Sequence, residues 1–153
     1  MSNSDELMRA PMSWDEYLAL EDTPGEYYGG CDLAPGTSVT QAWGWSPTGV
    51  REELIPDLMV HDETDEERTL TGTPHLVVEI LSSNRRDDLV GKLNRYAQWG
   101  APAYWIVDPR DHVILTHRLD GGYFVETGRF TSGAAKLAYG EVEVSVDIDT
   151  LLD

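Results

Sequence analysis

A strand–helix–strand pattern in the middle of the sequence constrains the fold most. HLVVEILSS, residues 75–83, is almost continuously apolar, as expected for a strand that is covered on both faces. Residues 87–99 follow a helical period with one apolar stripe, and Gly100 ends that helix. AYWIVDP, residues 103–109, reads as a second buried strand. This order predicts a βαβ unit, in which the two strands are parallel and are joined by a right-handed crossover.

Two further strands are predicted before this unit. VTQAWGW, residues 39–45, and LIPDLMVH, residues 54–61, are rich in strand formers, and a turn sequence separates them, so they predict a hairpin. Pro56 predicts that the second strand is bulged or lies at a sheet edge, because proline cannot donate to a ladder. The acidic stretch 62–73 is predicted to be a loop.

The two ends of the sequence add a helix and more strands. HVILTHRL and GYFVETGRF flank Asp120 and Gly121, which predicts a second hairpin, and VEVSVDID predicts a last short strand. SWDEYLALE, residues 13–21, has the capping-box signature of a helix start. These elements together predict an α/β fold with a mixed sheet.

The length predicts one domain, residues 1–153, with one substantial core. Within it we expect an N-terminal helix and loop at 1–38, a core at 39–109 and C-terminal strands at 110–153. Cys31 is the only cysteine, which excludes an internal disulfide. The sequence has neither a signal-peptide pattern nor an apolar run of membrane-spanning length, so we expect a cytoplasmic protein with no membrane partner.

The charge of the chain argues against nucleic acid as a partner, with one local exception. A formal net charge of −17 repels polyanions at long range, unless positive charge is concentrated locally. Four of the eleven basic residues do gather in one short window after the first buried strand. They are Arg85, Arg86, Lys92 and Arg95. On charge alone, a solvated helix face is the favoured interpretation of this window.

Two carboxylates interrupt the most apolar strands. Strand alternation puts Glu79 on one face with Val77, and an unpaired buried carboxylate would be costly, so Glu79 needs a partner, a metal or a proton. Asp57 is set in a similar apolar run in the neighbouring hairpin. Acids on adjacent strands can converge, and hard cations such as Mg²⁺ prefer such oxygen ligands. Two alternatives stay open: Asp57 as a turn or bulge residue, and Glu79 paired with an arginine across the sheet.

Lys92 is a third candidate. It lies on the rim of the apolar helix stripe, near Tyr96 and Trp99. A lysine there can extend its ammonium group into water, or it can reach back over the strand end toward Glu79. In the second case, its charge could orient an attacking water or stabilise a transition state.

These segments resemble a known family. IPDLMV, PHLVVEILSS and DLVGKLNRYAQWGAPAYWIVDP, in this order, are similar to the Uma-two family of putative restriction endonucleases, in the PD-(D/E)XK nuclease superfamily. The likeness covers roughly residues 39–125 and weakens toward both ends. It implies a restriction-endonuclease-like core with the order βββαβ, followed by a C-terminal β-hairpin. The region after GEYYGG is shorter than the family pattern by one helix and part of a hairpin.

The resemblance implies a set of site residues. Asp57 matches the aspartate of the PD motif, and Glu79 matches the acid of the (D/E)XK motif. The lysine of that motif would fall on Leu81, but in the resembled family it comes from the following helix, where Lys92 matches. The serine after the strand matches Ser82. The place of an upstream accessory acid matches Glu26.

The expected function is therefore that of a metal-dependent endonuclease that hydrolyses phosphodiester bonds of nucleic acid, with DNA favoured over RNA as the substrate. Asp57, Glu79 and the carbonyl of Ile80 would hold Mg²⁺ or Mn²⁺. The expected phosphate contacts are Arg85, Arg86 and Arg95. The alternative is a catalytically inactive binding or interaction module with the same fold, and a homodimer is left open.

Three aromatic positions have weaker functional interpretations. His61 follows the PD strand and could approach a metal, but a surface position is the expectation. Trp43 and Trp45 share a strand face and could stack on bases, although core or hairpin packing is favoured.

Overall fold

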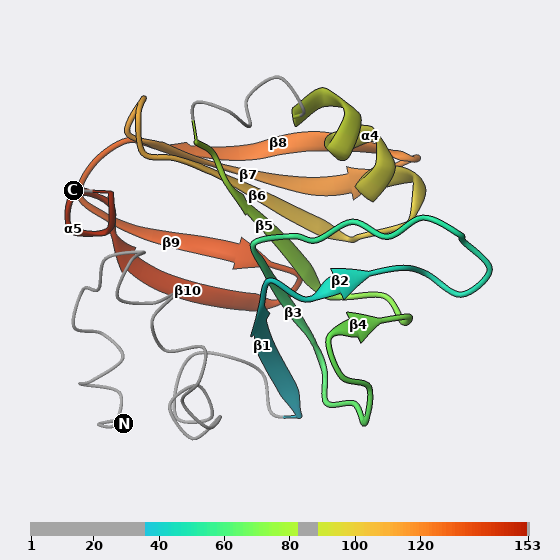
Figure 1. The fold of residues 1–153 in the computed structure, drawn as a ribbon. Helices are drawn as coiled ribbons and strands as arrows, with labels where there is room; N and C mark the ends of the chain where they lie inside the picture. Colours follow the sequence, from blue (N-terminus) through green and yellow to red (C-terminus); the bar gives the residue numbers. More distant parts are fainter. Residues whose placement is uncertain (1–35, 83–88, 153) are drawn as a thin grey trace.

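The computed structural model describes residues 36–82 and 89–152, which build a six-stranded mixed sheet flanked by smaller elements (Figure 1). The sheet runs in the order β1 (Thr37–Gln41), β3 (Leu58–Asp62), β5 (Leu76–Ile80), β6 (Ala103–Asp108), β7 (Val113–Asp120) and β8 (Tyr123–Phe130). The helix predicted at 13–21 and the candidate residues Glu26, Arg85 and Arg86 lie outside the described residues.

The predicted βαβ unit is confirmed. β5 and β6 are parallel, with Glu79 aligned to Ile106, and α4 (Leu89–Gln98) connects them. The helix ends where Gly100 adopts a φ of 86°, and the amide of Ala101 donates back to the carbonyl of Tyr96. With β1 and β3 before it, the unit gives the expected order βββαβ, so the mixed-sheet fold class is also confirmed.

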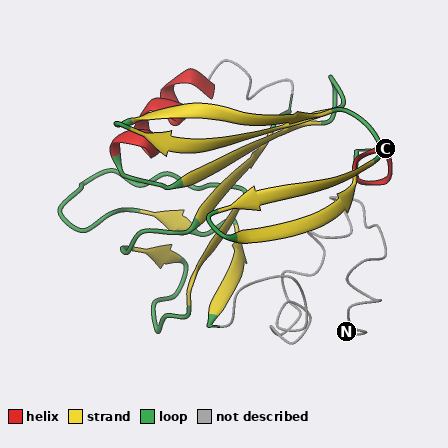
Figure 2. Cartoon of the chain, turned by 180° about the vertical axis from the view of Figure 1, so that it is seen from behind, coloured by secondary structure: helices red, strands yellow, loops and turns green. Residues whose placement is uncertain are grey.

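Strand alternation divides the core into two clusters, one on each face of the sheet. One face of β3, β5 and β6 contributes Met59, Val77 and Tyr104, and α4 covers this face with Tyr96. Residues of the opposite face, such as Val78 and Trp105, pack in a second cluster. That cluster is completed by β9 (Ala134–Tyr139), β10 (Val142–Asp147) and α5 (Ile148–Leu151). Figure 2 shows β9 and β10 as a separate two-stranded sheet.

The first predicted hairpin pairs as expected, but its strands are shorter. β1 and β3 are antiparallel, with Val39 opposite Val60. The predicted strand 39–45 is interrupted at Ala42, whose φ of 58° does not fit a strand. Beyond this break, β2 (Gly44–Trp45) pairs with β4 (Thr69–Leu70) in a small parallel sheet, so the stretch 62–73 is not wholly a loop.

Of the two alternatives predicted for Pro56, a bulge or a sheet edge, the edge position is wrong. β3 begins at Leu58 and lies between β1 and β5, so it is an inner strand. Pro56 precedes this strand, where its missing donor costs no ladder bond. Of the residues before it, Leu54 forms only an isolated bridge with Trp45.

The C-terminal hairpin is confirmed and is followed by elements that were not predicted. β7 and β8 are antiparallel, from the pair Ile114 and Phe130 to the pair Asp120 and Tyr123. Gly121 and Gly122 form the turn between them, and both have positive φ, as a two-residue hairpin turn requires. β10 matches the predicted last strand, whereas β9 and α5 are additional. No helix in the described part of the chain is long and apolar enough to span a membrane.

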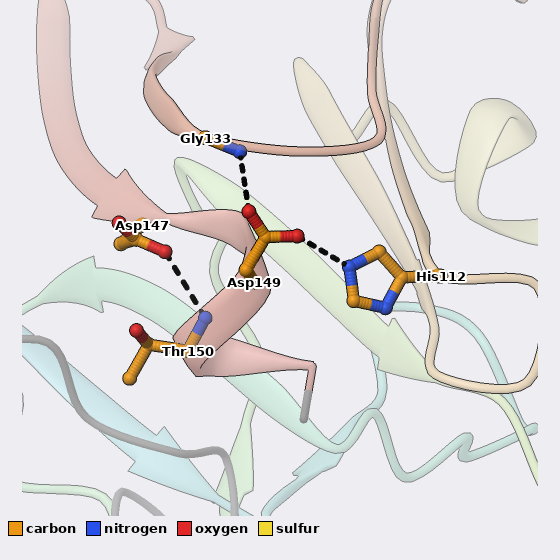
Figure 3. Close-up of polar contacts among 5 residues, drawn as sticks. All are labelled: His112, Gly133, Asp147, Asp149 and Thr150. Carbon is orange, nitrogen blue, oxygen red and sulfur yellow. Dashed lines mark hydrogen bonds and ion pairs between the residues drawn. The ribbon is translucent and has the colours of Figure 1, made fainter.

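Asp149 ties α5 to two other segments (Figure 3). One carboxylate oxygen accepts a hydrogen bond of 3.0 Å from the amide of Gly133, and the other accepts one of 3.0 Å from Nε2 of His112. These bonds lower the pKa of Asp149, the Gly133 amide having the largest effect. Asp147 caps α5 by accepting from the amide of Thr150 at 3.0 Å.

Candidate functional site

Asp57 and Glu79 come from neighbouring strand segments and are held at the same level of the sheet. β3 and β5 are antiparallel, with Leu58 opposite Val78, so continuing the register by one residue places Asp57 opposite Glu79. Opposite residues of an antiparallel pair point to the same face. The amide of Ile80 also donates to Oδ2 of Asp57 at 2.6 Å, which fixes this carboxylate beside the backbone that carries Glu79.

Glu79 is buried, with a relative exposure of 1%, and α4 supplies partners for both of its oxygens. The hydroxyl of Tyr96 donates to Oε2 at 2.6 Å. The ammonium of Lys92 lies 3.8 Å from Oε1. Lys92 keeps about a quarter of its side chain exposed, at 23%, so it reaches the buried carboxylate from the rim of the site. The lysine thus reaches back toward Glu79, one of the two arrangements expected for it.

Tyr96 is a permanent hydrogen-bond donor in this arrangement. Burial, and then the negative charge of Glu79, raise the pKa of its hydroxyl far above the ordinary value. The phenol therefore stays protonated and donates to the carboxylate, because it cannot release its proton in the physiological pH range. Its ring is fixed by Trp45, at a centroid distance of 5.9 Å, and by Tyr104, at 5.5 Å.

Two of the remaining predicted contact residues, Ser82 and Arg95, belong to the described part of the chain. Ser82 is exposed just beyond the end of β5. The amide of Leu81 donates to the carbonyl of Val107 at 2.8 Å, which extends the pairing of β5 with β6 past Ile80. Arg95 is exposed on α4 and forms a 2.6 Å ion pair with Glu52. A phosphate at Arg95 would therefore compete with a carboxylate of the same chain.

The expectation of a surface position for His61 is wrong. Its relative exposure is 1%, because it lies on an inner strand and Trp43 stacks on its ring at 5.4 Å. Nδ1 of His61 donates to the carbonyl of Asp62 at 2.7 Å, and Nε2 is 3.2 Å from the hydroxyl of Thr40. Trp45 is fully buried and donates to the carbonyl of Gly72 at 2.8 Å, so its side chain belongs to the core.

Two residues at the site were not predicted from the sequence. Tyr96 was placed near Lys92 on the apolar stripe and was given no polar role, although its position four residues after Lys92 places both side chains on one helix face. That spacing was the available signal for its polar role. Glu52 gave no comparable signal, since it is 43 residues from Arg95 in the sequence.

Comparison with known proteins identifies a family and a similar fold. The family model Uma2, described as putative restriction endonuclease, matches residues 29–138. A solved structure described as a putative nuclease belonging to DUF820, from Anabaena variabilis, superposes with a TM-score of 0.63 at 14% sequence identity. The match covers 99% of this chain and 82% of that chain, and at this identity it supports the fold alone. A search of curated proteins gives no match.

Proposed function

Because the chain belongs to the Uma2 family of putative restriction endonucleases, we propose that it is an endonuclease that hydrolyses phosphodiester bonds of nucleic acid, with DNA as its substrate and Mg²⁺ or Mn²⁺ as its cofactor. The observation that carries this proposal is a pair of contacts at the end of β5. Asp57 is anchored on the amide of Ile80, and Glu79 lies 3.8 Å from the ammonium of Lys92.

The donor set at this point fits a hard divalent cation. The cation would be held by the carboxylates of Asp57 and Glu79 and by the main-chain carbonyl of Ile80. Within residues 36–82 and 89–152, no group of three or more His, Cys, Asp and Glu side chains could hold a metal ion. Mg²⁺ does not require one, since it is commonly bound through one or two carboxylates and retains several waters. A carboxylate can accept a hydrogen bond and still ligate, because its two oxygens offer about four acceptor positions.

The residues of the chain would divide the chemistry between them. A bound cation would polarise a phosphate and lower the pKa of a bound water. The amide of Ile80 would hold the carboxylate of Asp57 in place, and the hydroxyl of Tyr96 would do the same for the carboxylate of Glu79. Lys92 would orient the attacking water, or offset the negative charge that develops on the phosphate in the transition state.

Substrate binding must overcome the strongly acidic composition of the chain. At a net charge of −17, phosphate contacts have to come from local basic residues. Arg95 is proposed as one of them, exchanging Glu52 for a phosphate oxygen, and Ser82 lies exposed at the end of β5. Arg85 and Arg86 are proposed as further phosphate contacts from their place in the sequence.

A plasmid-nicking assay tests this function. Wild-type protein is incubated with supercoiled DNA and either Mg²⁺, Mn²⁺ or a chelator, beside Asp57→Asn, Glu79→Gln and Lys92→Ala. Two exposed positions on β10 and β9 provide matched controls, Glu143→Gln and Lys136→Ala. We expect cation-dependent nicking by the wild type and both controls, and its loss in the three site variants. Equal behaviour of all six proteins would contradict the assignment and favour the inactive-module alternative.

A further inference from the structure

Lys92 and Tyr96 lie one turn apart on α4 and contact the two oxygens of a single carboxylate. Tyr96 donates to Oε2 of Glu79 at 2.6 Å, while the ammonium of Lys92 is 3.8 Å from Oε1. Residues four apart share a helix face, so the sequence K-x-x-x-Y places both groups over Glu79. The terminal torsion of a glutamate is otherwise soft, and two different partners on its two oxygens restrict that rotation.

The core, and not the site itself, fixes the position of the Tyr96 hydroxyl. The side chain of Tyr96 has a relative exposure of 0% and packs between Trp45 and Tyr104. Trp45 is itself held by its bond to the carbonyl of Gly72. Because the ring cannot shift without disturbing this packing, its hydroxyl is a fixed point against which the Glu79 carboxylate is set. A donor–acceptor distance of 2.6 Å is typical of a strong bond to an ionised acceptor.

We infer that Tyr96 is a positioning residue, which holds the Glu79 carboxylate in the orientation in which it binds a divalent cation. This inference rests on the proposed function. Tyr96 would contact neither the cation nor the substrate, and it would act only through Glu79. Loss of such an outer hydrogen bond typically weakens metal binding about 10-fold to 100-fold.

The test compares two tyrosine-to-phenylalanine variants. Tyr96→Phe removes the hydroxyl and keeps the ring. Tyr139→Phe makes the same change at a buried tyrosine of the other core cluster, beside Trp105. Calorimetric titration of the metal-free proteins with Mn²⁺ should give a dissociation constant about 10-fold to 100-fold higher for Tyr96→Phe than for the wild type. Tyr139→Phe should bind Mn²⁺ as the wild type does.

The Mn²⁺ dependence of nicking provides a second readout, which a merely structural role would not change. Tyr96→Phe should need more Mn²⁺ for its half-maximal rate and should approach the wild-type rate at saturation. A wild type whose Mn²⁺ binding is absent, or does not depend on Asp57 and Glu79, overturns the proposed function and this inference with it. Wild-type Mn²⁺ affinity in folded Tyr96→Phe overturns the inference alone.

A structure of the wild type with Mn²⁺ decides the matter if Tyr96→Phe does not fold. Retention of the bond between the Tyr96 hydroxyl and Oε2 of Glu79 in the Mn²⁺-bound protein would support the inference. A Glu79 carboxylate that has turned away from Tyr96 to reach the cation would overturn it.

Discussion

The amide of Ile80 donates a 2.6 Å hydrogen bond to Oδ2 of Asp57, and this bond joins the two strand segments that carry the acids of the site. It explains why Asp57 keeps a defined position although it lies just before the first residue of β3. The carbonyl of Asp57 also accepts a hydrogen bond of 3.1 Å from the amide of Ala42, which continues the pairing of β1 with β3 by one residue. The carboxylate of Asp57 is thus bonded directly to the backbone next to Glu79.

Replacing Asp57 by alanine should destabilise the protein more than replacing it by asparagine. Asp57→Ala leaves the Ile80 amide without its acceptor and should lower the free energy of unfolding by about 1–3 kcal/mol. Asp57→Asn keeps an acceptor oxygen, so its loss should be smaller. Denaturant unfolding measures both, with Asp65→Ala in the exposed acidic stretch as the control. Equal stability of Asp57→Ala and the wild type would show that the bond contributes nothing.

Lys92 and Glu79 should be energetically coupled. Lys92→Met removes the positive charge beside a buried carboxylate and should cost about 1–3 kcal/mol of stability, less than a fully buried pair because the lysine is partly exposed. Adding Glu79→Gln removes the buried negative charge that Lys92→Met leaves without its partner. The double variant should therefore lose less free energy of unfolding than the two single variants lose together. A double-mutant cycle in denaturant measures this coupling, which we expect to be about 0.5–3 kcal/mol.

The control for this cycle is Lys136→Met, because Lys136 is an exposed lysine on β9. Its combination with Glu79→Gln should be additive. If the effects of Lys92→Met and Glu79→Gln are also additive, the 3.8 Å approach of the Lys92 ammonium to Glu79 contributes no interaction energy.

The sequence predicted the parts of the site that depend on regular periods. Alternation along β5 placed Glu79 on the face of Val77, and the helical period placed Lys92 at the rim of the stripe that covers this face. The strand pairing then followed from the βαβ order, because connections of this kind are strongly restricted. These rules place Glu79 and Lys92 on the same side of the sheet, whereas the approach of Asp57 was expected from the adjacent hairpin and from the family resemblance.

Features that depend on tertiary contacts were not predictable in this way. Ala42 takes a positive φ although nothing in VTQAWGW marks a break, and β4 is a two-residue strand that exists only through pairing with β2. His61 reads as polar, yet the stacking of Trp43 buries it. Tyr96 fits an apolar stripe equally well with or without a bond from its hydroxyl.

Releasing Arg95 from Glu52 should strengthen DNA binding with little effect on stability. Both side chains of this ion pair are exposed to solvent, so its loss should change the free energy of unfolding by less than about 1 kcal/mol. In a Glu79→Gln background, in which we expect no cleavage, Glu52→Gln should lower the dissociation constant for a DNA duplex measured by fluorescence anisotropy. If Arg95 gains a phosphate contact, the dependence of binding on salt should steepen by about one unit.

Glu126→Gln is the matched control for Glu52→Gln. It makes the same charge change at an exposed glutamate, which pairs with Arg129 on β8. Equal effects of the two substitutions would mean that only net charge matters and that Arg95 has no particular role.

Asp149 should make the docking of the C-terminal elements sensitive to acid. Its pKa in the folded protein is lowered below the ordinary value of 3.8, so its carboxylate contributes stability above about pH 4. That contribution is lost as the pH falls through the lowered pKa. Asp149→Asn should therefore melt at a lower temperature than the wild type at neutral pH, and the difference in melting temperature should shrink as the pH falls below 3.8 and through the lowered pKa. A difference that stays constant, or one that Asp65→Asn reproduces, would contradict this role.

Anomalous diffraction from crystals soaked in Mn²⁺ tests the central claim most directly, because it locates the cation without reference to activity. We predict one strong anomalous peak within coordination distance of Asp57, Glu79 and the carbonyl of Ile80, and its loss in crystals of Glu79→Gln. Soaked crystals with no peak there, or with the same peak in Glu79→Gln, would contradict the claim that these residues form a metal-dependent nuclease centre.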